Sequence, residues 1–178
     1  MKKMKKMKLI ACSLMLFASM NTFAQKEAGA TVGLLKLDAD GAKSIYGINV
    51  FAKKQIKDKI RAGLNIGYFS ESEGSTSNSI IPISGLVEYK FNENTLSPYL
   101  GGEVGIFMES SKSNSNSEYS TKSSTSSTNL AFAPVAGFDY KINDDFKANV
   151  NAKYHFVKYE GITLNYLGFN VGVVYNLK

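Results

Sequence analysis

The feature that most constrains the fold is an alternation of apolar and polar side chains that recurs along most of the chain. In the last segment one face carries Leu167, Phe169, Val171, Val173, Tyr175 and Leu177, and the other carries Tyr166, Gly168, Asn170, Gly172 and Asn176. Successive side chains of a β-strand point to opposite faces, so this period of two indicates a two-faced strand. Helical spacing of apolar residues is not sustained anywhere after residue 24.

Eight segments show this alternation, at residues 28–37, 44–53, 60–68, 83–91, 98–109, 130–142, 146–156 and 167–177. Most have about ten to fourteen residues, whereas an average globular strand has about five or six. A strand tilted by about 45° needs roughly 9 to 11 residues to cross the hydrocarbon layer of a membrane. The pattern therefore predicts an all-β fold, an eight-stranded antiparallel up-and-down transmembrane β-barrel. A soluble barrel or sandwich with its apolar face inward is the alternative, because alternation alone is compatible with both.

The composition of the second face and the position of the aromatic residues favour the membrane barrel. The second face carries many Gly, Asn and Ser residues, as expected of a crowded polar interior. Aromatic residues gather near the segment ends, with Tyr89, Phe91, Phe138, Tyr140, Phe146 and Tyr175 at one rim and Tyr46, Tyr68, Phe132, Tyr154 and Phe156 toward the other. Two such girdles are typical of transmembrane barrels.

The amino-terminal segment has the pattern of a secretory signal peptide. Five lysines lie within the first eight residues, an apolar run follows from Leu9 to Met20, and small residues precede Gln25. We predict a signal peptide over residues 1–24 and one barrel domain over residues 25–178. Lipidation at Cys12 is the alternative reading, but little apolar sequence precedes it. The formal net charge of +6 falls to +1 without the five lysines, so no basic patch indicates nucleic acid as a partner.

The connections between segments predict an orientation. Residues 54–58, 92–97 and 143–145 form short polar joins, whereas residues 71–79 and 110–128 form longer ones. In outer-membrane barrels the short turns face the periplasm and the longer loops face outside. Residues 110–129 include ten Ser, three Thr and three Asn, which leaves almost nothing to bury. The two longer loops, 71–79 and 110–128, are therefore the candidate contacts for surface ligands, and a simple solvated cap over the barrel mouth is the alternative.

An eight-stranded barrel is only wide enough for its side chains to fill it, so an open solute pore is not expected. We predict a structural network of charged residues in this interior, made of Arg61, Glu88, Lys90, Glu103, Asp139 and Lys141. Lys147, Lys153 and His155 share the same face. If the hairpin is centred between residues 74 and 75, Arg61 lies opposite Glu88, which predicts a salt bridge between them.

The residues provide little for catalysis. His155 is the sole histidine and is predicted to be a hydrogen-bonded interior residue rather than a general base. No serine lies in a nucleophile-elbow context, and one histidine with scattered carboxylates provides no metal ligand set. We therefore expect no catalytic residue, no cofactor and no metal. A narrow porin-like channel and a lipid-modifying enzyme stay as alternative functions.

Several stretches together are similar to a known family. The strand end at residues 86–91, the Ser-Pro-Tyr-Leu-Gly-Gly-Glu-Val-Gly stretch at residues 97–105 and the closing strand at residues 168–177 resemble the small outer-membrane β-barrel proteins of OmpA-like or OmpX-like type. The resemblance covers essentially the whole chain after residue 24. It implies location in the cell outer membrane, insertion by the outer-membrane assembly machinery, contact with outer-membrane lipids, and a structural or adhesion-like role at the surface.

Overall fold

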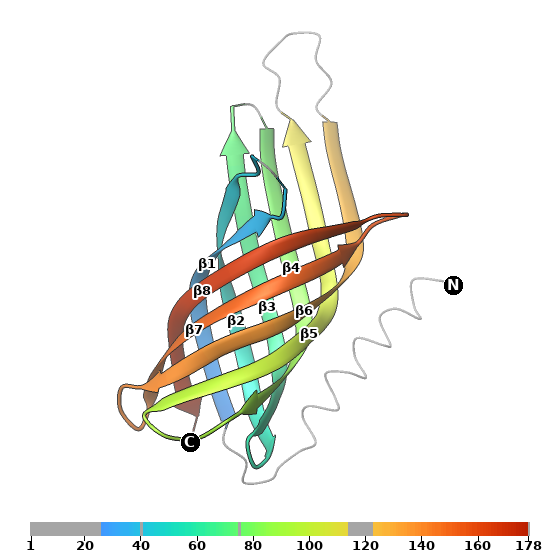
Figure 1. Ribbon diagram of the computed structural model, residues 1–178. Helices are drawn as coiled ribbons and strands as arrows, with labels where there is room; N and C mark the ends of the chain where they lie inside the picture. Colours follow the sequence, from blue (N-terminus) through green and yellow to red (C-terminus); the bar gives the residue numbers. More distant parts are fainter. Residues whose placement is uncertain (1–25, 40, 75, 114–122, 178) are drawn as a thin grey trace, which may run out of the picture.

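The computed structural model describes residues 26–39, 41–74, 76–113 and 123–177. It is a closed barrel in which each strand pairs with the next in chain order (Figure 1). The strands are β1 (Lys26–Leu37), β2 (Ser44–Lys57), β3 (Ile60–Glu73), β4 (Thr76–Lys90), β5 (Leu96–Ser113), β6 (Ser123–Lys141), β7 (Phe146–Lys158) and β8 (Thr163–Leu177). The predicted eight-stranded antiparallel barrel is confirmed. The predicted signal peptide lies outside the described residues.

The barrel closes between its first and last strands. β1 pairs with β2 on one side and with β8 on the other, and the second register runs from Lys26↔Leu177 to Leu37↔Tyr166. Closure gives both outer strands a partner, which removes the sheet edges that a membrane cannot solvate. None of the described residues belongs to a helix that is long and apolar enough to cross a membrane.

The two faces of the strands point as the alternation predicts. Phe169, Val171 and Val173 on β8 are 49%, 52% and 47% exposed on the outer wall. On β7, Asn149 and Lys153 are 0% and 8% exposed in the interior. The apolar side chains therefore form the outside of the barrel, as in a protein whose solvent is lipid, and the polar ones fill its inside.

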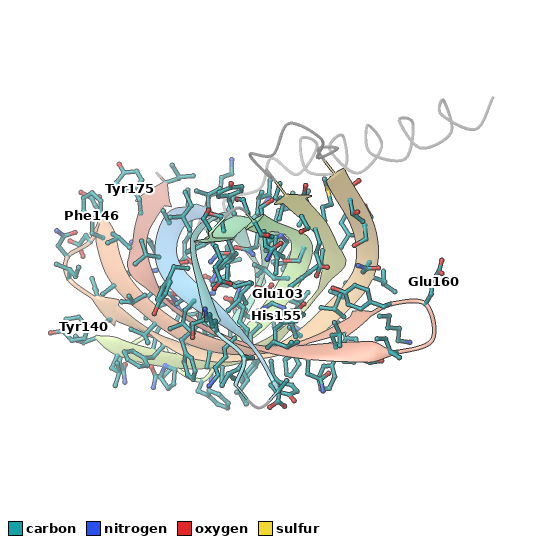
Figure 2. All side chains as sticks on the ribbon, turned by 90° about the horizontal axis from the view of Figure 1, so that it is seen from above. Glu103, Tyr140, Phe146, His155, Glu160 and Tyr175 are labelled. Atoms are coloured by element: carbon teal, nitrogen blue, oxygen red, sulfur yellow. The ribbon has the colours of Figure 1, made fainter. Side chains whose placement is uncertain are left out.

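Aromatic side chains lie on the outer wall near the strand ends. Tyr140, Phe146 and Tyr175 point away from the wall in the view along the barrel (Figure 2), and the rings of Phe146 and Tyr175 are 5.1 Å apart. Near the opposite rim, Phe132 stacks on Phe156 with their ring centroids 4.6 Å apart. Amphipathic and aromatic rings at both ends of an apolar band favour the two interfaces of a membrane.

Two segments predicted as long loops contain strand in their described parts. β3 continues to Glu73 and β4 begins at Thr76, and the two strands pair as far as Glu73↔Thr76. Gly74 follows β3 with a φ of 57°, which suits glycine. β5 continues to Ser113 and β6 begins at Ser123; residues 114–122 lie outside the described part. At residues 71–73, 76–79, 110–113 and 123–128 the prediction of loop was wrong, because backbone pairing between neighbouring strands does not require apolar side chains.

The outer ends of β3–β6 extend beyond the rest of the barrel (Figure 1). β5 pairs with β6 as far as Ser113↔Ser123, whereas the pairing of β6 with β7 begins only at Leu130↔Lys158. We call residues 71–74, 76–79, 109–113 and 123–129 the projecting sheet. The rim at this side is the loop end of the barrel, and the opposite rim, with the turns at residues 58–59, 91–95 and 142–145, is the turn end. The strands place Lys26 and Leu177 at the turn end as well.

Two prolines lie in the middle of their strands, Pro82 in β4 and Pro134 in β6, whereas Pro98 is the third residue of β5. Proline has no backbone N–H and therefore cannot donate to the strand ladder. The registers of β3 with β4 and of β6 with β7 each skip two positions beside these prolines, and then resume without a shift. The barrel wall thus tolerates both prolines by a local loss of pairing.

Candidate functional site

The interior near the turn end is organised around one arginine. The Arg61 side chain is 1% exposed, and its Nη1 donates to Glu27 Oε2 at 2.8 Å and to Asp139 Oδ2 at 2.6 Å. Its Nη2 lies 2.7 Å from Glu88 Oε2, and β3 and β4 place these two residues directly opposite each other. This is the register that the hairpin arithmetic predicts. One guanidinium therefore joins three carboxylates that come from β1, β4 and β6.

Two lysines complete this cluster. Lys53 Nζ lies 2.8 Å and 3.1 Å from the two carboxylate oxygens of Glu88, and Lys147 Nζ lies 2.5 Å from Glu27 Oε1. We call Glu27, Lys53, Arg61, Glu88, Asp139 and Lys147 the ion-pair network. The Tyr99 ring packs against it, 5.0 Å from Arg61 Cζ. Three cations thus balance three carboxylates, which is the condition for keeping charges out of water.

The structure separates the six residues predicted for the interior network. Arg61, Glu88 and Asp139 belong to the ion-pair network, whereas Glu103 lies in a second polar cluster, 2.6 Å from the Lys153 ammonium. Lys90 is buried near the turn end.

Lys141 does not belong to the network, contrary to prediction. Its side chain is 49% exposed and forms an ion pair of 2.7 Å with Asp144 in the neighbouring turn. It shares the inward direction of Asp139, but it is the last residue of β6, where the wall no longer encloses it. Alternation therefore indicates the direction of a side chain and not its depth.

Three members of the network are not among the six predicted residues. Lys147 was placed on the inward face only, and Glu27 and Lys53 were missed. Glu27 precedes the segment predicted from residue 28, and Lys53 ends a segment whose alternation is weak. Extending the parity of β1 by one residue would have placed Glu27 inside the barrel, opposite Lys53 in the β1–β2 register.

A chain of amides crosses the middle of the interior. Asn49 donates to Asn170 at 2.8 Å, Asn170 to Asn151 at 2.9 Å, and Asn151 to Asn149 at 2.8 Å. Asn149 in turn donates to Asp139 Oδ1 at 2.7 Å. These bonds link β2, β8 and β7 to the ion-pair network, and buried amides joined in this way satisfy one another.

The loop-end half of the interior is apolar, which differs from the predicted polar interior. The buried cluster consists of Leu35, Phe69, Ile80, Phe107, Ala131, Val157 and Tyr166. We call it the apolar plug. Its members break the alternation locally, as Phe69 does after Tyr68 and Phe107 after Ile106. Such inward apolar residues look like irregularities in a sequence, because period two does not say which of two adjacent apolar residues faces the lumen.

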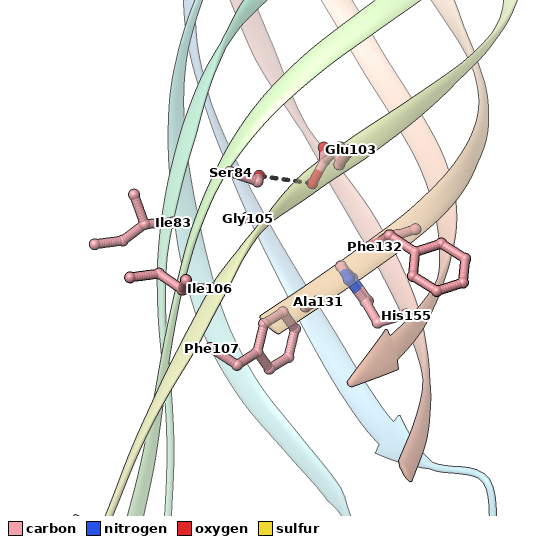
Figure 3. Close-up of a pocket in the computed structure, with 10 residues that line it drawn as sticks. Ile83, Ser84, Glu103, Gly105, Ile106, Phe107, Ala131, Phe132 and His155 are labelled. Atoms are coloured by element: carbon pink, nitrogen blue, oxygen red, sulfur yellow. Dashed lines mark hydrogen bonds between the residues drawn. The ribbon is translucent and has the colours of Figure 1, made fainter. Parts of the chain in front are cut away.

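His155 lies between the polar and apolar halves. It is buried, and its ring lies 5.1 Å from that of Phe107. Figure 3 shows both around a cavity of about 10 Å³ beside Glu103, which accepts a hydrogen bond of 2.9 Å from Ser84 Oγ. This cavity has room for about one water molecule.

A wider pocket of about 280 Å³ opens at the loop end. Its lower part is formed by Ile45, Ile80 and Tyr166, and residues of the projecting sheet line the rest. Glu109 accepts hydrogen bonds from Tyr166 and from Tyr159 in the loop after β7. Burial and the bond to Glu109 raise the pKa of Tyr159 above its ordinary value. No group of three or more potential metal-ligating side chains occurs within the residues that the structure describes.

The comparisons with known proteins agree with this architecture. Residues 9–176 match the family described as outer membrane protein beta-barrel domain. No curated protein matches the sequence.

Solved structures share the fold at low sequence identity. Neisserial surface protein A is similar with a TM-score of 0.68 and 14% identity over 85% of this chain and 97% of that one. Ail, the attachment invasion locus protein of Yersinia pestis, is similar with a TM-score of 0.60 and 18% identity over 86% of this chain and 97% of that one. OprG of Pseudomonas aeruginosa is similar with a TM-score of 0.54 and 15% identity over 86% of this chain and 96% of that one. The chain lies in the outer membrane and belongs to the outer membrane protein beta-barrel domain family.

Proposed function

We propose that this protein is a closed outer-membrane barrel with a structural and surface-interaction role, and that it contacts its surface ligands through the projecting sheet. The observation that carries the proposal is that side chains fill the lumen at two successive levels. The ion-pair network occupies the turn-end half and the apolar plug occupies the loop-end half. With the lumen occupied, the exposed loop end is the part available for interaction outside the cell.

The two levels oppose conduction for different reasons. An ion passing the ion-pair network would have to break contacts of 2.5–2.8 Å between buried charges. At the apolar plug it would lose its hydration without gaining a polar partner. These arguments favour a closed barrel over the narrow channel.

The arrangement of His155 favours a role without catalysis. The residue packs on Phe107 and lines a cavity of about 10 Å³, which is too small to admit a lipid or a peptide. A general base has to reach the substrate proton within hydrogen-bond distance. These observations support a packing role for His155 over a role as general base in a lipid-modifying enzyme.

The projecting sheet has the composition of a contact surface. Its β6 part, residues 123–129, consists of Ser, Thr and Asn, and among the described strands it pairs with β5 alone. Hydroxyl and amide groups adapt to many hydrogen-bonding partners. Ail, which shares the fold, was crystallised with the heparin analogue sucrose octasulfate; this supports a surface-contact role for barrels of this shape.

Two measurements test the proposal. Purified protein in planar lipid bilayers is expected to give no steady single-channel conductance, and a stable conductance would contradict the closed barrel. Cells that carry the protein are expected to adhere to immobilised glycans or matrix proteins, and to lose adhesion when residues 110–128 are replaced by a two-residue Asn-Gly turn. Glu160→Ala, in the neighbouring loop at the loop end, serves as the matched control. Equal adhesion by the shortened variant would contradict the assignment of the contact surface.

A further inference from the structure

A second pocket, of about 230 Å³, lies at the opposite rim of the barrel. We call it the turn-end cup. Its lining includes Lys90, Glu93, Asp139, Asp144, Lys147 and Asn176. Asp139 and Lys147 belong to the ion-pair network, so the network forms the inner end of the cup. The proposed surface function uses neither this pocket nor the residues that line it.

Lys90 is the exceptional charge in the cup. Its side chain points inward from β4 two residues after Glu88 and is only 4% exposed. Within the described part of the chain, its ammonium has neither a hydrogen bond nor an ion pair. The three carboxylates deeper in the barrel are each within 2.8 Å of a cation other than Lys90. Lys90 is therefore a fourth cation beside a network whose charges already balance.

The groups around Lys90 raise the free-energy cost of keeping its ammonium charged in the interior. Arg61 and Lys147 repel the Lys90 ammonium, and Glu27 and Asp139 attract it from beyond ion-pair distance. Both of these carboxylates are bound by Arg61. A buried ammonium is stable only with a counter-charge or with hydrogen-bond acceptors. Lys90 lines the cup, so water there can solvate the ammonium, and a mobile anion that enters would add the missing counter-charge.

A second polar group in the cup lacks a partner. Asn176 donates from its side-chain nitrogen to the Asp144 carbonyl oxygen at 2.7 Å, and its Oδ1 is buried without a hydrogen-bond donor in the described structure. This oxygen accepts hydrogen bonds. The wall of the cup therefore holds one cation without an ion pair and one buried acceptor without a donor. A ligand with an anionic group and an N–H donor would pair with both once the Asn176 side chain turns its oxygen toward the cup.

The charges of the cup select the kind of anion. Three cations and three carboxylates line the cup, and among these cations Lys90 is the one without an ion pair, since Lys141 is paired with Asp144 and Lys147 with Glu27. Lys90 therefore attracts one negative charge, and the neutral lining as a whole attracts no more. A monoanion therefore fits better than a phosphate dianion or a polyanion. The volume is below the range of drug-sized sites, so the ligand part that enters is small.

We propose that the turn-end cup binds the carboxyl-terminal end of a peptide, with the terminal carboxylate on Lys90 and the adjacent amide N–H on Asn176 Oδ1. The turn end of an outer-membrane barrel faces the periplasm, so the ligand comes from that compartment. The barrel thereby has a binding site on the side opposite to the projecting sheet.

The test uses the protein in lipid nanodiscs and the dipeptide N-acetyl-alanyl-alanine, with binding followed by NMR shifts of the turn-end amides. The free acid is expected to bind saturably, and the same dipeptide with an amidated carboxyl terminus is expected not to bind. Lys90→Gln should weaken the binding of the free acid at least tenfold. Lys57→Gln, which removes an exposed charge at the same rim outside the cup, should change the affinity less than twofold.

Three results would overturn the proposal: equal binding of the amidated dipeptide, unchanged affinity in Lys90→Gln, or an equal loss in Lys57→Gln. Asn176→Ala is expected to weaken the binding of the dipeptide but not that of acetate, which has no N–H. An unchanged affinity for the dipeptide would refute the peptide assignment. Thermal unfolding without ligand checks the premise independently. Because Lys90 is unpaired, Lys90→Gln should unfold at a temperature no lower than the original protein, and a clear fall would show that Lys90 has a structural partner.

Discussion

Removal of the Glu88 carboxylate is the most direct test of the ion-pair network. Glu88 is the carboxylate bound by Lys53, at 2.8 Å and 3.1 Å, and it also lies 2.7 Å from Arg61. In Glu88→Ala, Arg61 keeps Glu27 and Asp139, but Lys53 is left buried without a carboxylate. Breaking a buried pair from one side costs about 3–5 kcal/mol, because the remaining charge is uncompensated.

This cost corresponds to a fall of roughly 6 to 20 °C in the midpoint of thermal unfolding, taking about 2–4 °C per kcal/mol for a chain of this size. The midpoint can be followed by the heat-dependent gel shift of the barrel or by circular dichroism in detergent. Lys141→Ala is the matched control, since its ion pair with Asp144 is exposed and such pairs contribute no more than about 1 kcal/mol.

A double variant separates charge from packing. Lys53→Met with Glu88→Leu removes both charges while keeping most of the volume, and it should recover much of the stability lost in Glu88→Ala. The reasoning fails if Glu88→Ala unfolds at the original temperature, or within the range of Lys141→Ala. It also fails if the double variant is as unstable as the two single changes added together.

Three further predictions follow from the orientation and packing of the strands. Val171→Arg places a charge in lipid and should lower the free energy of unfolding by about 2–4 kcal/mol near the midplane, whereas Asn170→Arg faces the lumen and should mainly disturb packing. Urea unfolding from lipid vesicles measures both variants, and equal losses would mean that the two faces are misassigned. Gly137→Ala should cost about 1–3 kcal/mol, because its new Cβ would lie 2.5 Å from a β7 carbonyl oxygen, while Gly85→Ala, with nothing nearer than 3.9 Å, should unfold as the original does. Phe107→Ala opens the apolar plug and should destabilise the barrel by about 3–5 kcal/mol; conductance bursts that the original lacks would support its role in closure, and a silent variant would assign closure to the ion-pair network.

Local pairing explains which contacts the sequence could predict. Arg61 and Glu88 belong to adjacent strands of one hairpin, so counting residues from its centre was enough to place them opposite each other. Glu27 and Asp139 reach the same guanidinium from 34 and 78 residues away. Those distances depend on how the barrel closes, which no count along a single hairpin provides.

Depth explains the opposite outcomes of two similar lysines. Lys90 and Lys141 both point inward and both end a strand, yet Lys90 is buried and Lys141 is exposed. Their parity is the same, and the difference comes from how far the neighbouring strands and turns extend beside each of them. The serine-rich ends of β5 and β6 were mistaken for loops for a related reason, since the partner strand stabilises them and their own side chains do not.

By itself, the sequence determined the class of the protein, because it shows strands of membrane-crossing length with an apolar outer face and a polar inner face. Both faces follow from the alternation of side chains, which is a local property of an extended backbone. The tertiary structure alone decided that the six charges of the ion-pair network, Arg61 among them, come together, that the loop-end half of the lumen is apolar, and that Lys90 has no ion pair among the described residues. The reason is physical. Electrostatic and packing energies depend on distances across the lumen, and those distances exist only once the first strand has paired with the last.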